Sequence, residues 1–128
     1  MSKIERIVVK TDKAPAAIGP YSAGIIAGDF VFTSGQIPVD PVSGAMAESI
    51  EAQTHQSLSN VKAVLEAAGA SLDRVVKTTV FLQSMGDFAA MNAVYSEFFT
   101  ADCPARSAVE VAKLPKGALV EIEAVAVK

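Results

Sequence analysis

One arginine late in the chain has the chemistry needed to bind a small organic acid. Arg106 follows Cys103 and Pro104 and opens a run of small and apolar residues that ends at Val111. Its guanidinium group is planar and permanently charged, so it can hold a carboxylate through two parallel hydrogen bonds. The competing interpretation is a surface arginine paired with a glutamate, an arrangement that is common and contributes little stability.

Two other segments place a glycine beside hydroxyl side chains. Residues 33–38 read Thr-Ser-Gly-Gln-Ile-Pro at the expected end of a strand, where Gly35 leaves its backbone N–H open to a ligand. Residues 19–22 read Gly-Pro-Tyr-Ser, and the hydroxyl of Tyr21 is available to line a pocket. Taken alone, each segment is more typical of an ordinary turn.

Histidine and cysteine are too scarce for several kinds of chemistry. His55 and Cys103 are the only residues of their types, so a zinc site built on these ligands has too few. A mechanism with two histidines is impossible, and a Ser-His-Asp arrangement would have to use His55. Cys103 is interpreted as an unreactive thiol, and no glycine-rich phosphate-binding pattern is present. We therefore expect no metal and no cofactor.

The composition is that of a folded protein without a strongly charged surface. Of 128 residues, 51% are hydrophobic and 20% are charged, and the formal net charge is −3. The lack of a lysine or arginine run argues against nucleic acid as a partner. No apolar run approaches the roughly 20 residues that cross a bilayer, and the first residues lack the core of a signal peptide. With one cysteine and hence no intramolecular disulfide, we expect a cytoplasmic protein with a single domain over residues 1–128.

Apolar residues recur with a helical period in two segments. From Ser49 to Ala68 they form one stripe, and Gly69 stands where a helix-ending glycine is expected. The stripe consists of Ile50, Thr54, Leu58, Val61, Leu65 and Ala68. Asp87 can cap a second helix, whose buried face is formed by Phe88, Met91, Val94, Tyr95 and Phe98.

Runs of β-branched and aromatic residues predict strands on both sides of these helices. The first strand spans residues 4–9, and a tight hairpin joins residues 23–27 and 30–34 through Gly28-Asp29. Further strands are expected at residues 75–82, 106–111 and 119–127. This order predicts an α+β fold in which two helices pack on one face of a mixed β-sheet.

The last predicted strand indicates what covers the other face of the sheet. Alternate residues should point to the helices, namely Val120, Ile122, Ala124 and Ala126. The opposite set is mostly apolar yet includes Glu121 and Glu123, which favours an oligomer interface over a water-facing surface. In the preceding strand, Arg106, Ala108 and Glu110 share one side. A cation and carboxylates are therefore expected to meet on the face without helices.

Taken together, the motifs are similar to those of a known family. In order and spacing, the chain resembles the RidA (YjgF) family through residues 19–22, 34–38, 104–107, 114–115 and 120–124. The resemblance covers essentially the whole chain. It implies a chorismate-mutase-like fold and a homotrimer with ligand clefts between subunits. It also implies deamination of reactive 2-imino acids, the enamine and imine products of amino-acid dehydratases.

The resemblance also implies roles for individual residues. Arg106 would bind the substrate carboxylate, and Glu121 would position or activate the attacking water. The rest of the cleft would be lined by Tyr21, Ser34, Gly35 and Asn92. One departure concerns Ala108, because many members that resemble active deaminases have cysteine there. If this position contributes only its backbone carbonyl, alanine should serve; if the thiol takes part, its contribution is missing in this chain. Hydrolysis of an imino acid needs a carboxylate anchor, a placed water and proton transfer, and neither a metal nor a covalent nucleophile.

Two other classes of function stay open at this point. One is a ribonuclease or translation inhibitor, an activity reported for some relatives, although the acidic balance and the absence of a basic, aromatic strip argue against tight RNA binding. The other is a non-catalytic module, binding small carboxylates or acting like a chaperone. Such a module would keep Arg106 but would not need Glu121.

Overall fold

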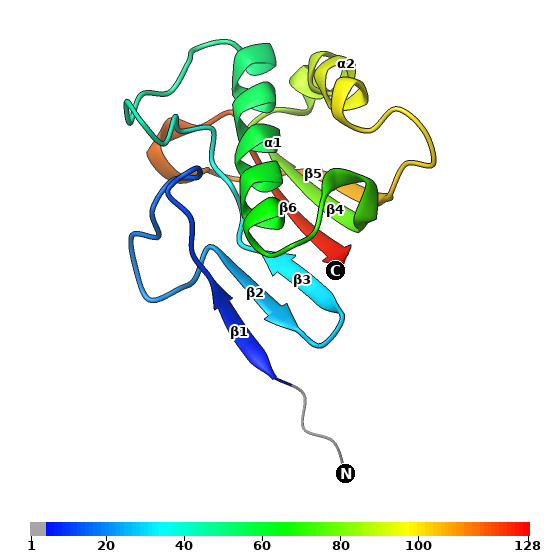
Figure 1. The fold of residues 1–128 in the computed structure, drawn as a ribbon. Helices are drawn as coiled ribbons and strands as arrows, with labels where there is room; N and C mark the ends of the chain where they lie inside the picture. Colours follow the sequence, from blue (N-terminus) through cyan, green and yellow to red (C-terminus); the bar gives the residue numbers. More distant parts are fainter. Residues whose placement is uncertain (1–4) are drawn as a thin grey trace.

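The computed structural model describes residues 5–128, which form a six-stranded sheet with two α-helices (Figure 1). The strands are β1 (Arg6–Val9), β2 (Gly24–Ala27), β3 (Phe30–Thr33), β4 (Val75–Leu82), β5 (Ala105–Glu110) and β6 (Val120–Val127). The helices are α1 (Ile50–Ala67) and α2 (Phe88–Phe98), with short 3-10 turns at Leu72–Arg74, Met85–Asp87 and Pro115–Gly117. The predicted α+β class is confirmed.

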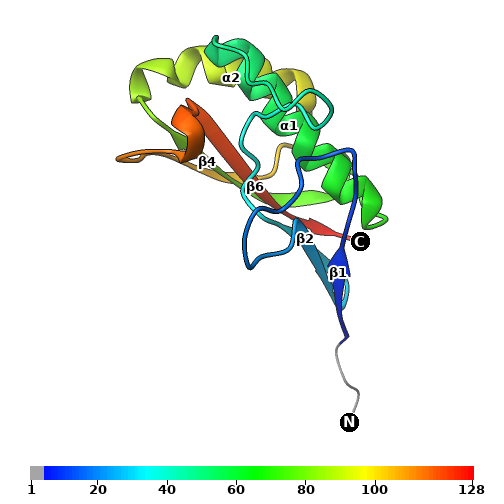
Figure 2. The ribbon, with the colours of Figure 1, turned by 90° about the vertical axis from the view of Figure 1, so that its left-hand side faces the viewer.

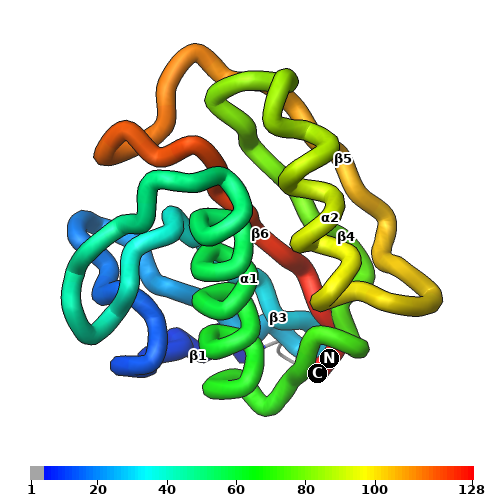
Figure 3. The backbone as a smooth tube through the Cα atoms, turned by 90° about the horizontal axis from the view of Figure 1, so that it is seen from above, coloured from blue at the N-terminus to red at the C-terminus, as the bar shows by residue number. Residues whose placement is uncertain are grey.

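The sheet is mixed, and its order brings distant segments together. The order is β1-β2-β3-β6-β4-β5, in which only the β4–β5 pair is parallel among the described strands. The parallel pair is joined through α2, as parallel neighbours require a crossover. Both helices lie on the same side of the sheet in Figure 2, and they run side by side above it in Figure 3. The predicted layer of two helices on one face is thus confirmed.

The predicted hairpin and the first helix are confirmed in detail. Ala27 pairs with Phe30 across a two-residue turn in which Gly28 has φ 59°, a left-handed conformation that glycine adopts without strain. Helix α1 begins after Ser49, whose side chain accepts a hydrogen bond from the N–H of Ala52 at 3.1 Å. It is followed by Gly69 with φ 83°. Of the first predicted strand, residue 4 lies outside the described residues.

One predicted detail of the second helix, its capping by Asp87, is wrong. Asp87 does precede α2, but its side chain makes no capping hydrogen bond. A 3-10 turn leads directly into the helix there, and Asp87 itself has nearly helical φ and ψ angles of −89° and 2°. A capping side chain normally needs an extended backbone to reach the helix N–H groups. The position of the helix start is confirmed, whereas the capping role is not.

The core lies between the helices and the inner face of the sheet. Leu58, Val61 and Leu65 of α1 and Met91 of α2 are fully buried there. In β6, the inward set Val120, Ile122, Ala124 and Ala126 is at most 2% exposed, as the alternation predicted. Each buried leucine, methionine, valine or isoleucine side chain of this core stabilises the fold by about 1.5–3 kcal/mol. None of the helices in residues 5–128 has both the length and the apolar character to span a membrane.

The prediction that Arg106 meets carboxylates on the face without helices is wrong for a single chain. Arg106 pairs with Thr78 in the β4–β5 register, and Thr78 is buried beneath α2. Glu121 pairs with Phe81, three residues further along β4. Because side chains alternate along a strand, Arg106 faces the helices and Glu121 faces away from them. Small Ala108 points inward beside Arg106, while the larger Val109 lies on the outer face.

Candidate functional site

The first group of predicted site residues, the arginine half-site, comprises Arg106, Asn92 and Ala108. Arg106 leaves β5 toward α2, where its guanidinium donates a hydrogen bond to the amide oxygen of Asn92 at 2.7 Å. The guanidinium carbon also lies over two aromatic rings, 4.7 Å from the ring centre of Tyr95 and 5.5 Å from that of Phe88. These contacts hold a long and otherwise flexible side chain in one place.

The surroundings of Arg106 are neutral. Its neighbours are an amide and two rings, and no carboxylate among residues 5–128 pairs with it. The interpretation of Arg106 as a surface arginine paired with a glutamate is therefore wrong for the described part of the chain. A half-buried guanidinium with only neutral partners has no counter-ion within residues 5–128, which makes it a suitable site for an anion.

Ala108 contributes its backbone to the same half-site. β5 is the last strand of the sheet, and the N–H of Val111 donates to the carbonyl of Leu82 on β4. Since the bonding direction alternates along a strand, the N–H and C=O groups of Ala108 point to the free edge. A backbone carbonyl at this position is consequently open to a ligand whatever side chain it carries.

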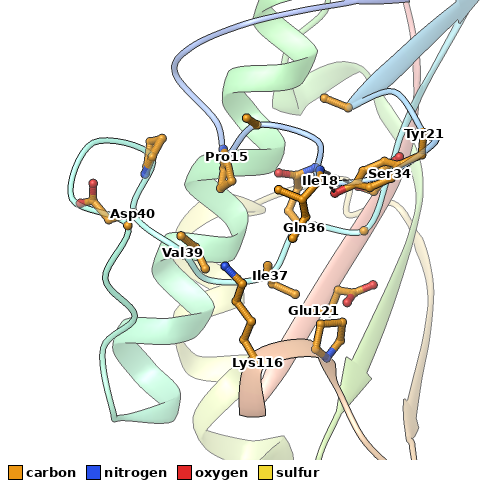
Figure 4. A pocket seen from close by; sticks show the side chains of 16 residues that line it. Pro15, Ile18, Tyr21, Ser34, Gln36, Ile37, Val39, Asp40, Lys116 and Glu121 are labelled. Atoms are coloured by element: carbon orange, nitrogen blue, oxygen red, sulfur yellow. Dashed lines mark hydrogen bonds between the residues drawn. The ribbon is translucent and has the colours of Figure 1, made fainter.

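The second group, the glutamate half-site, comprises Tyr21, Ser34, Gly35 and Glu121. These residues line one cavity of about 600 Å³. Figure 4 shows Tyr21 and Ser34 on one side of it, with Glu121 below them. The remaining walls are largely apolar and come from three loops, including Pro15, Ala16, Ile18, Ile37, Val39, Pro41 and Pro115, while Lys116 rises along one side.

Gly35 makes room for the Glu121 carboxylate. A Cβ atom built on Gly35 would collide with the carboxylate group of Glu121. The local strand pairing explains the close approach: after Thr33, whose hydroxyl accepts a hydrogen bond from the N–H of Ala124, β3 leaves β6 and rejoins it only at Gln36. Between these two points the N–H of Gly35 has no partner among the described residues. The predicted open backbone donor is present.

The two hydroxyl residues are fixed in different ways. The Ser34 hydroxyl donates to the carbonyl of Ser22 at 2.6 Å, which ties the strand end to the segment that carries Tyr21. The Tyr21 hydroxyl accepts a long hydrogen bond, 3.4 Å, from the N–H of Ile18, and half of the side chain is exposed. Both oxygens therefore keep hydrogen-bonding capacity for a ligand in the cavity.

The acidity of Glu121 is shifted by its surroundings. Burial raises the pKa of its carboxyl group above the usual value of 4.5, and the negative charge of Glu123 raises it further. A shift in this direction makes the carboxylate a stronger base than an exposed glutamate. Tyr95, whose ring lies beside Arg106, also has a raised pKa, because its phenol is buried.

A row of polar residues on α1, which was not predicted from the sequence, supports the glutamate half-site. Gln53, Ser57 and Asn60 are each at most 3% exposed. The Ser57 hydroxyl donates to the carbonyl of Gln36 at 2.6 Å, and the Asn60 amide donates to two carbonyls of the same loop. The oxygen of Gln53 accepts from the N–H of Leu119, two residues before Glu121. Their i, i+4, i+7 spacing was the signal that could have revealed them.

Neither of the two rarer residues lies in the cavity. His55 is exposed on α1, where its ring meets the edge of Phe98 at 5.1 Å between centres. Cys103 is exposed as well, and its thiol donates to the carbonyl of Phe99. Neither is among the residues that line the cavity beside Glu121.

Comparison with known proteins identifies the family. The family described as Endoribonuclease L-PSP matches residues 11–128 of this chain. The chain belongs to this family. It is the RidA (YjgF) family that the sequence motifs predicted, and solved members share the fold. The structure of the YjgF gene product from E. coli superimposes with a TM-score of 0.93 at 53% identity, covering 95% of this chain and 98% of that one.

Several RidA-family relatives are similar over nearly their whole length. A 2-iminobutanoate/2-iminopropanoate deaminase of Salmonella typhimurium is 58% identical over 123 residues, which cover 94% of this chain and 96% of the relative. The protein of the same name from Escherichia coli K12 is 54% identical over the same shares. A structure of E. coli TdcF with bound serine has a TM-score of 0.93 at 48% identity, covering 95% of this chain and 98% of that one.

Proposed function

We propose that this protein is a deaminase that hydrolyses 2-iminobutanoate and 2-iminopropanoate to 2-keto acids and ammonia. Relatives that are 58% and 54% identical carry that name. The observation on the molecule that carries the proposal is a fixed guanidinium, Arg106, that no carboxylate of residues 5–128 neutralises. An anionic small molecule is the partner that such a group lacks.

The two half-sites divide the chemistry between them. Arg106 holds the substrate carboxylate. The open N–H of Gly35 and the hydroxyls of Tyr21 and Ser34 line the cavity in which the rest of the substrate lies beside Glu121. Glu121 accepts a proton from water as the water oxygen bonds to the imine carbon, and the electron pair of the C=N bond moves to nitrogen. Two protons then reach that nitrogen, one returned by Glu121 and one from the hydroxyl group just formed, so that the C–N bond breaks as the C=O bond forms, which releases ammonia and leaves the keto acid.

Arg106 and Glu121 lie on opposite faces of the sheet, which supports an active site shared between subunits. We propose a homotrimer in which Arg106 of one subunit approaches the cavity of the next, as the family resemblance implies. The outer face of the sheet supplies an apolar surface for such an assembly. Phe30, Phe32 and Val109 are 46%, 44% and 43% exposed there, and Phe32 pairs with Val125 on β6. Apolar patches of this kind usually mark interaction sites.

The enzymatic activity is tested directly by supplying short-lived substrates. A dehydratase acting on threonine or serine generates 2-iminobutanoate or 2-iminopropanoate in place, and keto-acid release is measured with and without this protein. Faster release supports the deaminase, and an unchanged rate contradicts it. A parallel incubation with structured and single-stranded RNA tests the ribonuclease alternative. We also propose that the protein is cytoplasmic, so the assays are run at the pH and ionic strength of the cytoplasm.

The shared site makes a prediction that a single-chain site does not. Arg106→Ala and Glu121→Gln chains with different tags are co-expressed, and trimers carrying both tags are purified. Any such mixed ring contains one cleft in which the wild-type Arg106 and the wild-type Glu121 meet, so about one third of the wild-type activity should return. If both groups acted within one chain, mixed assemblies would be as inactive as the parent variants. Light scattering on the wild type checks for about three chain masses.

A further inference from the structure

The position of the Arg106 guanidinium depends on one face of α2. Phe88, Asn92 and Tyr95 stand at i, i+4 and i+7, so all three side chains project toward β5 from the same side of the helix. Of the two rings, that of Tyr95 is closer to the guanidinium, at 4.7 Å against 5.5 Å for Phe88. Tyr95 therefore forms the main flat surface on which Arg106 rests.

The Tyr95 ring is itself held in place by a buried hydrogen bond. Its hydroxyl lies 2.7 Å from the hydroxyl of Thr78, and the two residues are 6% and 1% exposed. Thr78 is also the β4 residue that pairs with Arg106. A phenylalanine would fill the same space without burying a polar group, so packing alone does not call for the hydroxyl pair. What the pair fixes is the place of the ring relative to the Arg106 rung of the sheet.

We propose that Tyr95, held by Thr78, is the positioning residue that keeps Arg106 ready to bind the substrate carboxylate. The inference rests on the proposed deaminase function and deepens it. A carboxylate in place of Tyr95 would also hold the guanidinium, but it would neutralise the charge that the substrate needs. An aromatic face attracts the cation while leaving its N–H groups free at the edges for a carboxylate.

Four variants separate positioning from simple packing. Tyr95→Leu removes the ring, Tyr95→Phe keeps the ring without its hydroxyl, and Thr78→Val removes the partner hydroxyl at similar size. Phe99→Leu is the matched control. Phe99 is buried to the same extent and packs on Tyr95 with ring centres 4.8 Å apart, yet it makes no aromatic contact with Arg106.

Two readouts on the intact oligomer report on Arg106 without relying on turnover. The first is the dissociation constant for 2-ketobutanoate, measured by calorimetry. The second is the NMR signal of the arginine Nε–H groups, which is simple because the chain has three arginines, Arg6, Arg74 and Arg106. The Arg106 signal is assigned by its loss in Arg106→Lys.

We expect Tyr95→Leu to weaken 2-ketobutanoate binding by about tenfold, the effect of losing a partly desolvated cation–ring contact. The Arg106 side chain should become mobile in the same variant. Tyr95→Phe should recover most of the affinity, and Thr78→Val should show a small loss together with increased Arg106 motion. Phe99→Leu should lower thermal stability while leaving both the affinity and the Arg106 signal near their wild-type values.

Equal losses of affinity in Tyr95→Leu and Phe99→Leu would overturn the proposal, because Tyr95 would then act only through packing. An unchanged Arg106 signal in Tyr95→Leu would overturn it too. If Tyr95→Leu does not fold, the two hydroxyl variants decide the question. An Arg106 signal that is unaffected by both Tyr95→Phe and Thr78→Val would overturn the proposed role of the Tyr95–Thr78 hydrogen bond. Failure of the proposed function looks different: the wild type would neither hydrolyse imines nor bind 2-ketobutanoate, while the NMR comparison would still report how Arg106 is held.

Discussion

The arginine and glutamate half-sites differ in how their charged groups are held. Arg106 is fixed by neighbours from one compact stretch of sequence, α2 and β5, and each of its contacts is neutral. Glu121 stands beside a glycine in a wide cavity whose walls come from loops before β2, after β3 and before β6. The arginine half-site is therefore a charged group held by a helix and a strand, whereas the glutamate half-site is an open cavity lined mainly by loops.

This difference matches the two tasks that hydrolysis of an imino acid sets. A carboxylate anchor gains from rigidity, because each bond made to a fixed fork costs less conformational freedom. A proton-transferring carboxylate gains from burial, since burial raises its pKa toward the working range. The buried polar row of α1 gives the loops of the open half-site a firm support despite their length. Each half-site is prepared within one chain, and the proposed active site needs both.

The largest expected effect comes from Glu121→Gln, which tests the catalytic role of the open half-site. Glutamine keeps the size and one carbonyl acceptor but loses the negative charge. If Glu121 takes a proton from water, kcat should fall by about 10²–10⁴. The affinity for 2-ketobutanoate should change little, because Arg106 supplies the anchor. Both values are measured on the same variant.

The opposite pattern would assign Glu121 a different role. A changed affinity with kcat largely retained would mean that Glu121 only balances the charge of Arg106 in the assembled cleft. An unchanged kcat would remove Glu121 from the mechanism. The non-catalytic binding module would then become the better interpretation of the cavity. Glu123→Gln serves as the control when kcat is measured on the plateau above the acid limb, since it removes a neighbouring carboxylate on the same strand that does not line the cavity.

A smaller effect is expected from Arg106→Lys, which tests the rigid half-site. An ammonium group keeps the charge but cannot make two parallel hydrogen bonds or lie flat on Tyr95. Loss of a charge-assisted contact worth roughly 1.5–3 kcal/mol corresponds to about a 10–150-fold drop in kcat/KM. Most of that drop should appear in KM, in contrast to Glu121→Gln. Wild-type kinetics in the lysine variant would return Arg106 to a structural role.

The sequence predicted elements better than faces, and β5 shows why. In β6, Glu121 and Glu123 marked the outward set, so the alternation of side chains identified the inward set correctly. In β5, residues 105–110 alternate between two sets that both contain small or polar side chains, so hydrophobicity alone does not tell which set faces the helices. The register with Thr78 decides it, and pairing with a distant strand is not encoded in local periodicity.

The residues of the candidate site were predicted one by one, but their separation into two half-sites on opposite faces of the sheet was not. Motifs near Tyr21, Gly35 and Glu121 converge on one cavity because β6 inserts between β3 and β4, a long-range arrangement that composition and spacing do not reveal. Asn92 was placed in the site through the family resemblance, and it does contact Arg106. The contact between Tyr95 and Arg106 was not predicted, because a tyrosine at helical spacing is first of all a core residue.

The smallest expected effect concerns Glu123→Gln and sharpens the account of the open half-site. Glu123 raises the pKa of Glu121, so removing its charge should lower that pKa. Residues two apart on a strand project from the same face, so the Glu123 carboxylate adds like-charge repulsion to the larger effect of burial on Glu121. A general base works in its ionised form, so activity falls as the pH drops through its pKa. The acid limb of the kcat profile should therefore move slightly to lower pH in Glu123→Gln. A limb that stays in place would mean that burial alone tunes Glu121, and a limb that moves upward would contradict its assignment as the base.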